Sequence, residues 1–259
     1  MPLDTYKQKR NFKVTPEPAG APQKTKPASP KLEYVIQKHR ATSLHYDFRL
    51  EHNGVLLSWA VPKGPSLDPS VKRLAMHVED HPLEYGGFEG VIPEGEYGGG
   101  TVMVWDNGTW EPEVEDIDAA LQKGDLKFTL HGKKLKGSWV LVHTRGFAGS
   151  QNSWLLIKHR DEFASTEDVL TKRPRSVLTR RLLAEIAKTE GGDVAKAAAG
   201  DPPPTATPAV QTNRGKSAVA ARTQNVVRRA PKSAAPAQKR SVRARKSNAP
   251  KLHQTKTKS

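Results

Sequence analysis

The segment 44–51 alternates between apolar and polar residues, and this period of two is that of a β-strand. One face carries apolar side chains that require a core, those of Tyr46, Phe48 and Leu50. The other face carries an imidazole, a carboxylate and a guanidinium, those of His45, Asp47 and Arg49. A solvated strand face more often presents Lys, Thr, Glu or Ser. The segment therefore predicts a strand that separates an apolar core from a functional surface.

The polar face of this strand has the composition of a metal site. Neighbouring side chains on one strand face lie about 6–7 Å apart, so His45 and Asp47 can approach one small cation. His39 follows the strand-like run 32–36 and is the candidate third ligand. Two histidines and one carboxylate with open coordination positions are a recurrent catalytic metal set, and Arg49 would hold an anion beside it. The competing interpretation is a polar strand face with surface histidines.

Further strands are predicted where β-branched and aromatic residues alternate between turn-forming residues. The predicted strands are 32–37, 44–51, 55–61, 73–78, 101–105, 109–111, 125–130, 137–144 and 153–159. Asn-Gly pairs at 53–54 and 107–108 predict tight hairpin turns, and the glycine-dense segment 85–100 predicts bends and bulges. Eight or nine short antiparallel strands indicate a small β-barrel or a sandwich.

The chain divides into four predicted parts. Residues 1–30 form a flexible N-terminal arm, in which 10–18 either docks on the body or belongs to a disordered leader. The strands occupy residues 31–160, with one short helix at 117–122. Residues 161–190 connect to the tail and contain an amphipathic helix at 177–188. Residues 191–259 are rich in Ala, Pro, Lys and Arg and are predicted to be disordered.

The positive charge of the chain is concentrated in this tail. Residues 1–190 hold 27 basic and 25 acidic residues, whereas residues 191–259 hold 15 basic and 2 acidic residues. Such a tail predicts binding to a polyanion, most often nucleic acid. Cysteine is absent, which excludes disulfides and cysteine-ligated metals. Neither an apolar run of 18 residues nor a signal-peptide core is present, so we expect a soluble, unexported, cytoplasmic protein without a membrane partner.

Several blocks of the sequence resemble the 3′-phosphoesterase domain of bacterial ATP-dependent DNA ligase D. The blocks are 37–51, 57–66, 78–85 and 88–101, with a weaker similarity at 10–18. They occur in the order of the family and together cover roughly residues 31–159, which makes the resemblance far more specific than any one motif. Because the ligase and polymerase domains have no room in 259 residues, the resemblance implies a stand-alone version.

The resemblance implies a compact β-barrel with a Mn²⁺-dependent site, where Zn²⁺ or Co²⁺ are further candidates, that heals DNA 3′ ends. Such an enzyme removes a terminal ribonucleoside and then the 3′-phosphate, leaving a 3′-OH. The implied metal ligands are His39, His45 and Asp47, and the implied residues at the scissile phosphate are Arg49, His81 and Tyr85. The implied supporting residues are Gln37, Lys63, Arg73, Glu79, Arg10 and Glu17. Asn11 departs from the Asp that the family usually has in its arm.

The resemblance also implies partners and a location. The substrate would be a DNA 3′ end in a primer–template or a nicked duplex, and the partners would be end-joining proteins such as a ligase and Ku. The cell would be bacterial or archaeal, with the protein associated with the nucleoid. In this chemistry Arg49 would bind the phosphate with both prongs of its guanidinium, while His81 would either protonate the leaving oxygen or hydrogen-bond the transition state.

Two other functions are compatible with the residues. A non-haem iron oxygenase also uses two histidines and a carboxylate, although Arg49 beside the carboxylate suits a phosphate better. A DNA-binding accessory protein would act through its basic tail and leave the barrel inert. Among the remaining residues of interest, His52 and His77 are expected to be structural. The tryptophans are expected to pack in the core rather than to stack on bases, namely Trp59, Trp105, Trp110, Trp139 and Trp154.

Overall fold

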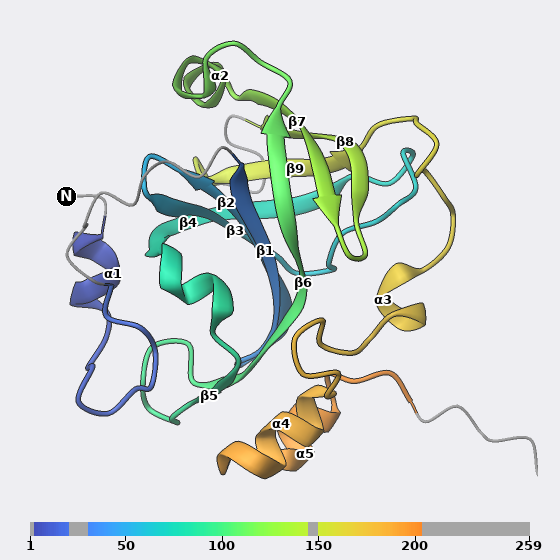
Figure 1. Cartoon of the computed structure of the whole chain (residues 1–259). Coiled ribbons are helices and arrows are strands. Elements are labelled where there is room, and N and C mark those ends of the chain that lie inside the picture. Colours follow the sequence, from blue (N-terminus) through green and yellow to red (C-terminus); the bar gives the residue numbers. More distant parts are fainter. Residues whose placement is uncertain (1–2, 21–30, 145–149, 204–259) are drawn as a thin grey trace, which may run out of the picture. The chain divides into compact units, whose positions relative to one another are not determined.

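Nine antiparallel strands form one sheet in the computed structural model, which describes residues 3–20, 31–144 and 150–203 (Figure 1). They are β1 (Leu32–Arg40), β2 (Leu44–His52), β3 (Val55–Val61), β4 (Arg73–Pro82), β5 (Gly90–Ile92), β6 (Gly100–Pro112), β7 (Asp125–Gly132), β8 (Lys136–His143) and β9 (Ser153–Lys158). The sheet closes because β1 pairs with both β2 and β6, so eight strands form a barrel. The short β5 pairs with the start of β6. The predicted mainly β, antiparallel barrel is confirmed.

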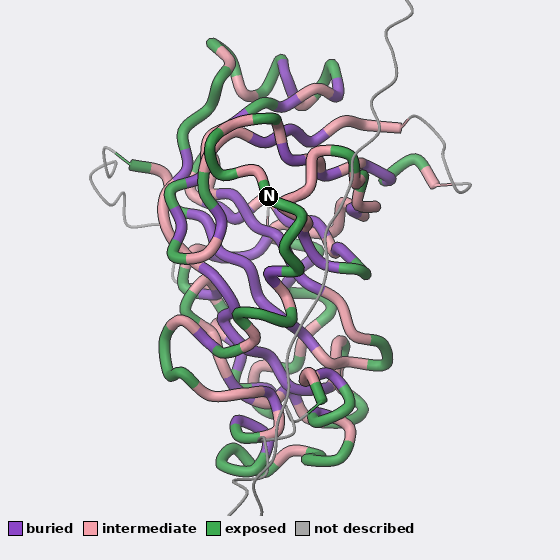
Figure 2. The backbone as a smooth tube through the Cα atoms, turned by 90° about the vertical axis from the view of Figure 1, so that its right-hand side faces the viewer, coloured by how far each residue is buried: buried purple, intermediate pink, exposed green. Residues whose placement is uncertain are grey.

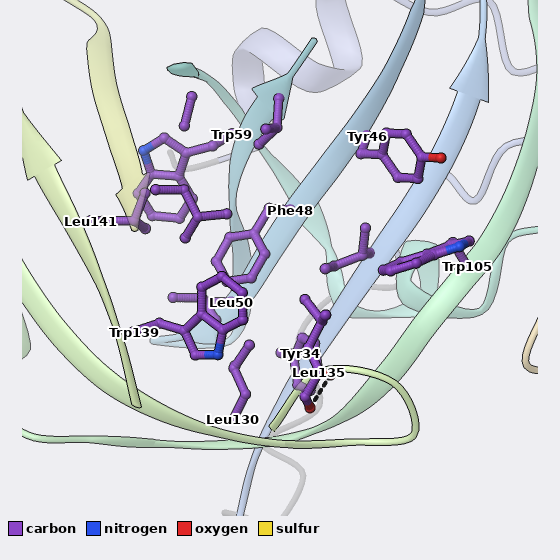
Figure 3. Packing of buried hydrophobic residues seen from close by; sticks show 14 of the residues in the cluster. Tyr34, Tyr46, Phe48, Leu50, Trp59, Trp105, Leu130, Leu135, Trp139 and Leu141 are labelled. Carbon is purple, nitrogen blue, oxygen red and sulfur yellow. Dashed lines mark hydrogen bonds between the residues drawn. The ribbon is translucent and has the colours of Figure 1, made fainter. Parts of the chain in front are cut away.

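The inside of the barrel holds the apolar face of β2. Tyr46, Phe48 and Leu50 are buried in one cluster with residues from each of the other seven barrel strands. Figure 3 shows part of this cluster. All five tryptophans are buried, which confirms that they pack in the core. Phe48 lies between the rings of Tyr34, Trp59 and Phe128, at centroid distances of 5.7 to 6.4 Å. Figure 2 shows that the buried stretches run through the interior of the molecule, while many of the outer bends of the tube are exposed.

The two Asn-Gly pairs have different outcomes. Asn53 and Gly54 both have positive φ, as a tight hairpin between β2 and β3 requires. The second pair forms no turn, because β6 runs unbroken through residues 107 and 108. The preceding Asp106 holds this stretch extended: its carboxylate accepts bonds from Tyr34 Oη, Lys134 N and Leu135 N. A bulge in the β1–β6 pairing lies beside it, so a bulged strand replaces the predicted hairpin.

The described residues contain more helices than the one or two that were predicted. They are α1 (Asp4–Gln8), η1 (Leu83–Gly87, a 3-10 helix), α2 (Ile117–Lys123), α3 (Val169–Lys172), α4 (Leu183–Glu190) and α5 (Val194–Ala198). The predicted helix at 117–122 is α2, which is capped by Asp116 and ended by Gly124 at φ 82°. Helix α4 lies within the predicted helix at 177–188, and the remaining helices have five residues or fewer, too short to show an apolar period. No helix in the described ranges is long and apolar enough to span a membrane.

The predicted helix at 177–188 begins only at Leu183. Upstream, Val177 N donates to Val104 O, which fixes the chain beside β6. Arg180 has a positive φ, which ends any helical path there. The Glu185 carboxylate accepts from Leu182 N, and the Asp201 carboxylate accepts from Leu183 N and Ala184 N. These carboxylates satisfy the free N–H groups of a helix that starts at this point.

The boundary of the predicted tail at Gly191 is wrong. Helix α5 follows α4 directly, and Asp201 reaches back to cap α4. Asp201 also lies 3.6 Å from the Nζ atom of Lys38, a buried cation on β1. The ordered part therefore continues at least to residue 203, and the rest of the predicted tail lies outside the described residues. Composition does not reveal helix α5, because its alanine-rich sequence resembles the alanine-rich sequence that follows it.

Candidate active site

The faces of β1 to β4 that point away from the core carry the predicted site. His39 on β1 lies directly opposite His45 on β2, and Gln37 lies opposite Asp47. Arg49 lies opposite Ser58 on β3. A register shift between β3 and β4 lets three residues of β4 face the same pocket, namely Val78, Glu79 and His81. Four neighbouring strands thus present their polar positions to one place.

Three candidate metal ligands lie together at the edge of this surface. Their ligand atoms, one each from His39, His45 and Asp47, lie within 4.8 Å of one another. His39 Nδ1 is 3.8 Å from Asp47 Oδ2, and His45 Nε2 is 3.5 Å from Asp47 Oδ1. The predicted third ligand therefore returns to the site through the β1–β2 hairpin.

The hydrogen bonds of the two imidazoles favour a cation at this point. His39 Nε2 lies 2.8 Å from the Gly98 carbonyl, and His45 Nδ1 lies 3.1 Å from the Ser43 carbonyl. A carbonyl only accepts hydrogen bonds, so in each histidine the ring nitrogen that faces the carbonyl carries a proton. The other nitrogen of each ring faces the Asp47 carboxylate. In a neutral ring this second nitrogen has a lone pair, so the three side chains offer their ligand atoms to one point where a cation can bind.

The charges of these groups fit the same interpretation. Burial raises the pKa of Asp47, but the adjacent Arg49 guanidinium and the histidines outweigh this effect, so its pKa lies well below the usual range. Burial lowers the pKa of His45, although Asp47 opposes the shift. At neutral pH the group therefore consists of an ionised carboxylate beside a neutral imidazole, the protonation states that metal binding requires.

Arg49 is buried at the centre of the site, with only 2% of its surface exposed. Nε donates to Gln37 Oε1, Nη2 donates to Asp47 Oδ2, and Nη1 contacts both Ser58 Oγ and His81 Nδ1. Three of the five N–H groups of the guanidinium thus donate to protein oxygens. The two-pronged contact with a phosphate stays a prediction. Arg49 positions Asp47 and His81 and adds positive charge between them.

His81 lies between two guanidinium groups. Its Nδ1 is 2.9 Å from Arg49 Nη1, and its Nε2 is 3.2 Å from Arg10 Nη2. Burial lowers the pKa of His81, and the charges of Arg49 and Arg10 lower it further, well below the ordinary value. Its ring is therefore neutral at pH 7. His81 Nδ1 also lies 2.9 Å from the Glu79 carbonyl, which only accepts, so Nδ1 carries the proton and Nε2 can accept from Arg10.

The N-terminal arm docks on the barrel and completes the site. Tyr6 on α1 is fully buried and contacts the rings of His81 and Tyr85. Arg10 Nε forms an ion pair of 2.9 Å with Glu17, whose carboxylate also accepts from Tyr85 Oη. Figure 1 shows α1 beside β4 and η1. The docking alternative is thus confirmed for residues 3–20, and residues 21–30 lie outside the described ranges.

A pocket of about 190 Å³ opens where these groups meet. Its lining includes all three candidate metal ligands together with Arg49, His81 and Tyr85, and the arm contributes Arg10. Glu79 lines it as well and receives an ion pair of 3.0 Å from Lys9. Two guanidinium groups, those of Arg10 and Arg49, and two carboxylates, those of Asp47 and Glu79, therefore line one small cavity.

Comparison with known proteins identifies this barrel. Residues 37–143 match the family described as the DNA ligase D 3′-phosphoesterase domain. This barrel belongs to that family. The chain is 53% identical over 185 residues to the multifunctional non-homologous end joining protein LigD of Pseudomonas aeruginosa, which covers 70% of the chain and 22% of that protein. It is 41% identical over 165 residues to the LigD protein of Mycolicibacterium smegmatis, which covers 62% and 21%. The chain thus spans about a fifth of the length of these curated relatives.

The phosphoesterase domain does not bring every predicted residue to the pocket. Gln37 is buried behind it, where its amide donates to the carbonyls of Tyr85 and Phe88. Lys63 is exposed beyond the end of β3, and Arg73 lies at the start of β4 with a buried Nε atom that has no hydrogen-bond partner among the described residues. Neither lines the pocket. The roles of Lys63 and Arg73 stay predictions.

Four residues of the phosphoesterase domain's site were not predicted as such. Ser58 accepts a hydrogen bond from Arg49, and the Gly98 carbonyl lies at hydrogen-bond distance from His39. Tyr97 lines the pocket, and Lys9 contacts its hydroxyl. Ser58 was detectable, because it is the polar residue in the apolar strand 55–61. The carbonyl of Gly98 carries no side-chain signal, and the approach of Lys9 depends on how the arm docks.

Proposed function

We propose that the chain is a metal-dependent phosphoesterase that acts on DNA 3′ ends. It removes a 3′-terminal ribonucleoside and then the remaining 3′-phosphate, which leaves a 3′-OH for extension or ligation. The observation that carries this proposal is the juxtaposition, in one pocket, of the His39–His45–Asp47 set with Arg10, Arg49 and His81. A metal set alone is compatible with many reactions, but the two adjoining guanidinium groups specify an anionic substrate such as a phosphate.

His39, His45 and Asp47 would hold the metal ion, since their ligand atoms lie within 4.8 Å of one another. Such a donor set accepts Mn²⁺, and Zn²⁺ or Co²⁺ bind imidazoles at least as tightly. When bound, the ion would polarise a phosphoryl oxygen and favour attack by water. A non-haem iron oxygenase could use the same ligands, but it has no need of two arginines beside them. The cations therefore favour phosphoester chemistry over that alternative.

The protein groups around the cavity divide the remaining work. Arg49 holds Asp47 and contacts His81, and it would supply positive charge at the phosphate from its place in the pocket lining. Arg10 reaches the same place from the arm and is held by Glu17. His81 is neutral in the free protein, which suits a hydrogen bond to a phosphoryl oxygen better than immediate proton donation. Tyr85 orients Glu17 and thereby Arg10.

We propose DNA ends in non-homologous end joining as the biological context, because the curated relatives are named for that process. Ku and a DNA ligase are the candidate protein partners, and the bacterial cytoplasm near the nucleoid is the expected location. The basic residues of 204–259 would add sequence-independent affinity for duplex DNA by displacing condensed counterions. The barrel itself would supply the chemistry.

The deciding experiment is hydrolysis of oligonucleotides with defined ends. Primer–templates that end in a 3′-phosphate, in a 3′-terminal ribonucleotide or in a 5′-phosphate are incubated anaerobically with Mn²⁺, Zn²⁺, Co²⁺ or Mg²⁺. We expect phosphate release from the first, loss of the terminal ribonucleoside from the second, and no reaction at the 5′-phosphate. Absence of both 3′ reactions with every metal would overturn the proposal. Turnover that requires oxygen would instead support the oxygenase.

The role of the tail is tested by a truncation after Pro203, which keeps the Asp201 cap of α4 that truncation at Glu190 would remove. Binding to a duplex with a recessed 3′ end is measured across a salt series. If about five tail cations contact phosphates, the log–log slope of the full chain is steeper by about 4 to 5. Equal slopes for the two proteins would show that the tail does not bind DNA and would favour a protein partner.

A further inference from the structure

Tyr97 departs from the other tyrosine that lines the pocket. It is 50% exposed, whereas Tyr85 and every tryptophan of the barrel are buried. Tyr97 lies between β5 and β6 in the glycine-rich loop, and no role was predicted for it. An exposed ring at the mouth of a polar cavity does not stabilise a core, so its position calls for a different explanation.

The loop ties Tyr97 firmly to the metal ligands. The next residue, Gly98, has φ 78° and accepts a hydrogen bond from His39 Nε2 through its carbonyl. Turn bonds from Glu96 N to Pro93 O and from Gly99 N to Glu96 O define the rest of the loop. The ring is therefore held one residue away from the group that orients a metal ligand. A loose loop tip would not have this constraint.

Cations from the arm lie next to the ring. Lys9 Nζ is 3.2 Å from Tyr97 Oη and 4.6 Å from the ring centroid. The guanidinium carbon of Arg10 is 5.7 Å from the same centroid, and Arg10 Nη2 contacts His81. Two cationic side chains, each also paired with Glu79, thus lie between the pocket and an exposed aromatic face. Proteins that bind single strands combine cations for the backbone with rings for the bases in this way.

We propose that Tyr97 is the stacking platform for the base of the nucleotide whose 3′ oxygen carries the scissile phosphate. The inference rests on the proposed function, because it places that phosphate at Arg10 and His81. The platform accepts any of the four bases, since every base has a π face. Its contribution is substrate binding and not the chemical step. Lys9 contacts the hydroxyl and one face of the Tyr97 ring, and the base of the bound nucleotide stacks on the part of the ring that stays exposed.

The test compares two 3′-phosphate oligonucleotides that differ only in whether the terminal nucleotide carries a base or is abasic. We expect Tyr97→Ala to raise KM about tenfold on the substrate with a base and to leave kcat within about twofold. On the abasic substrate the variant and the wild type should have the same KM. Tyr97→Phe keeps the ring and should behave as wild type. Phe163→Ala, which removes an exposed aromatic outside the pocket, is the matched control.

Three outcomes would overturn the platform. In the first, Tyr97→Ala has the same KM as the wild type on the substrate with a base. In the second, its KM rises equally on both substrates. In the third, Tyr97→Phe shows the same rise in KM as Tyr97→Ala. The last result would show that only the hydroxyl contact with Lys9 matters. Calorimetric titration with Mn²⁺ tests whether the substitution disturbs the loop that contacts His39. We expect the wild type and Tyr97→Ala to bind Mn²⁺ with equal affinity. A weaker affinity of the variant would show that its higher KM comes from a displaced His39.

A binding measurement separates this proposal from the proposed function. The oligonucleotide carries 2-aminopurine as its terminal base, whose fluorescence is quenched on stacking, and titration takes place in EDTA. Quenching by the wild type and by Tyr97→Phe but not by Tyr97→Ala supports the platform even if no phosphate is ever released. Equal quenching by all three proteins overturns it even if the wild type is an active phosphoesterase.

Discussion

The two faces of β2 differ in what holds them in place. On the inner face Tyr46, Phe48 and Leu50 contact other apolar side chains, and their positions depend on volume and shape. On the outer face Asp47 and Arg49 are nearly as buried, yet each depends on named partners at hydrogen-bond distance. Substitution on the inner face should therefore change stability, and substitution on the outer face should change chemistry.

The polar groups on the outer face of β2 do not fully satisfy one another's hydrogen-bonding and charge requirements. His39 and His45 face the Asp47 carboxylate at 3.8 and 3.5 Å, and the ring of His81 lies between two guanidinium groups. A fully self-satisfied network would have no use for a metal ion or a phosphate. The inner face has no comparable deficit apart from Trp59 Nε1, which lacks a partner in the described structure. Substitutions on each face can test this contrast between stability on the inner face and chemistry on the outer face.

The largest effect is expected for His45→Ala. Its side chain is 23% exposed and is held by one backbone carbonyl, so its loss should leave the thermal midpoint within a few degrees. Because it removes one of the three proposed metal ligands, the proposed 3′-phosphate release should fall by at least roughly 1,000-fold. The measurements are steady-state hydrolysis and Mn²⁺ affinity. His52→Ala is the matched control on the same strand, and near-normal turnover of His45→Ala would refute the metal site.

The opposite result is expected for Phe48→Ala, three residues along on the inner face. Removing a fully buried phenyl ring costs about 3–5 kcal/mol of stability, because the cavity refills only in part. Chemical denaturation measures this loss, and Phe48→Leu should recover most of it. Activity per folded molecule should stay within a few-fold of wild type. A variant that is stable but inactive would show that the two faces are coupled.

Arg49→Lys tests whether charge or geometry governs the outer face. Lysine keeps the charge but cannot contact Gln37, Asp47 and Ser58 at the same time. We expect kcat to fall about 100-fold, with a smaller change in Mn²⁺ affinity. Arg160→Lys, an exposed position, is the control. Full activity of the Arg49→Lys protein would mean that Arg49 acts only as a distant positive charge.

The sequence predicted much of this arrangement because the alternation of one strand encodes which residues share a face. It predicted His39, His45 and Asp47 as one group, and the barrel confirms that they lie together. It failed where long-range contacts override local signals. Asn107-Gly108 stays extended because Asp106 binds the β7–β8 turn, and helix α4 starts late because Asp201 caps it. Neither partner is visible in a local window of sequence.

The docked arm shows the same limit for the site. The composition of residues 10–18 left docking and disorder open, since Arg10 and Glu17 pair only once Tyr6 is buried against His81 and Tyr85. The pKa of His81 is lowered by burial and by two arginines that are distant in sequence. A residue type suggests a chemistry, but the neighbours supplied by the fold set its protonation state.

The smallest effect is expected beside the site, at Asp80 on β4. Burial raises the pKa of its carboxyl to about 6, Glu79 adds to the shift, and His52 opposes it. A carboxyl whose pKa is raised by folding stabilises the protein most when it is protonated. That contribution is complete below about pH 4, the pKa of the unfolded chain, and is lost as the pH rises through about 6.

Asp80→Asn removes this titration and keeps the shape of the side chain. The variant should match wild type near pH 4 and be more stable by about 1 kcal/mol above pH 6.5, a figure discounted for partial exposure. Denaturation midpoints measured at half-unit steps of pH give the difference curve, and Glu115→Gln, at an exposed carboxylate, should give a flat one. A difference that shrinks as the pH rises would mean that Asp80 is stabilised as an anion. The cations of the outer face would then extend their influence beyond the residues that line the pocket.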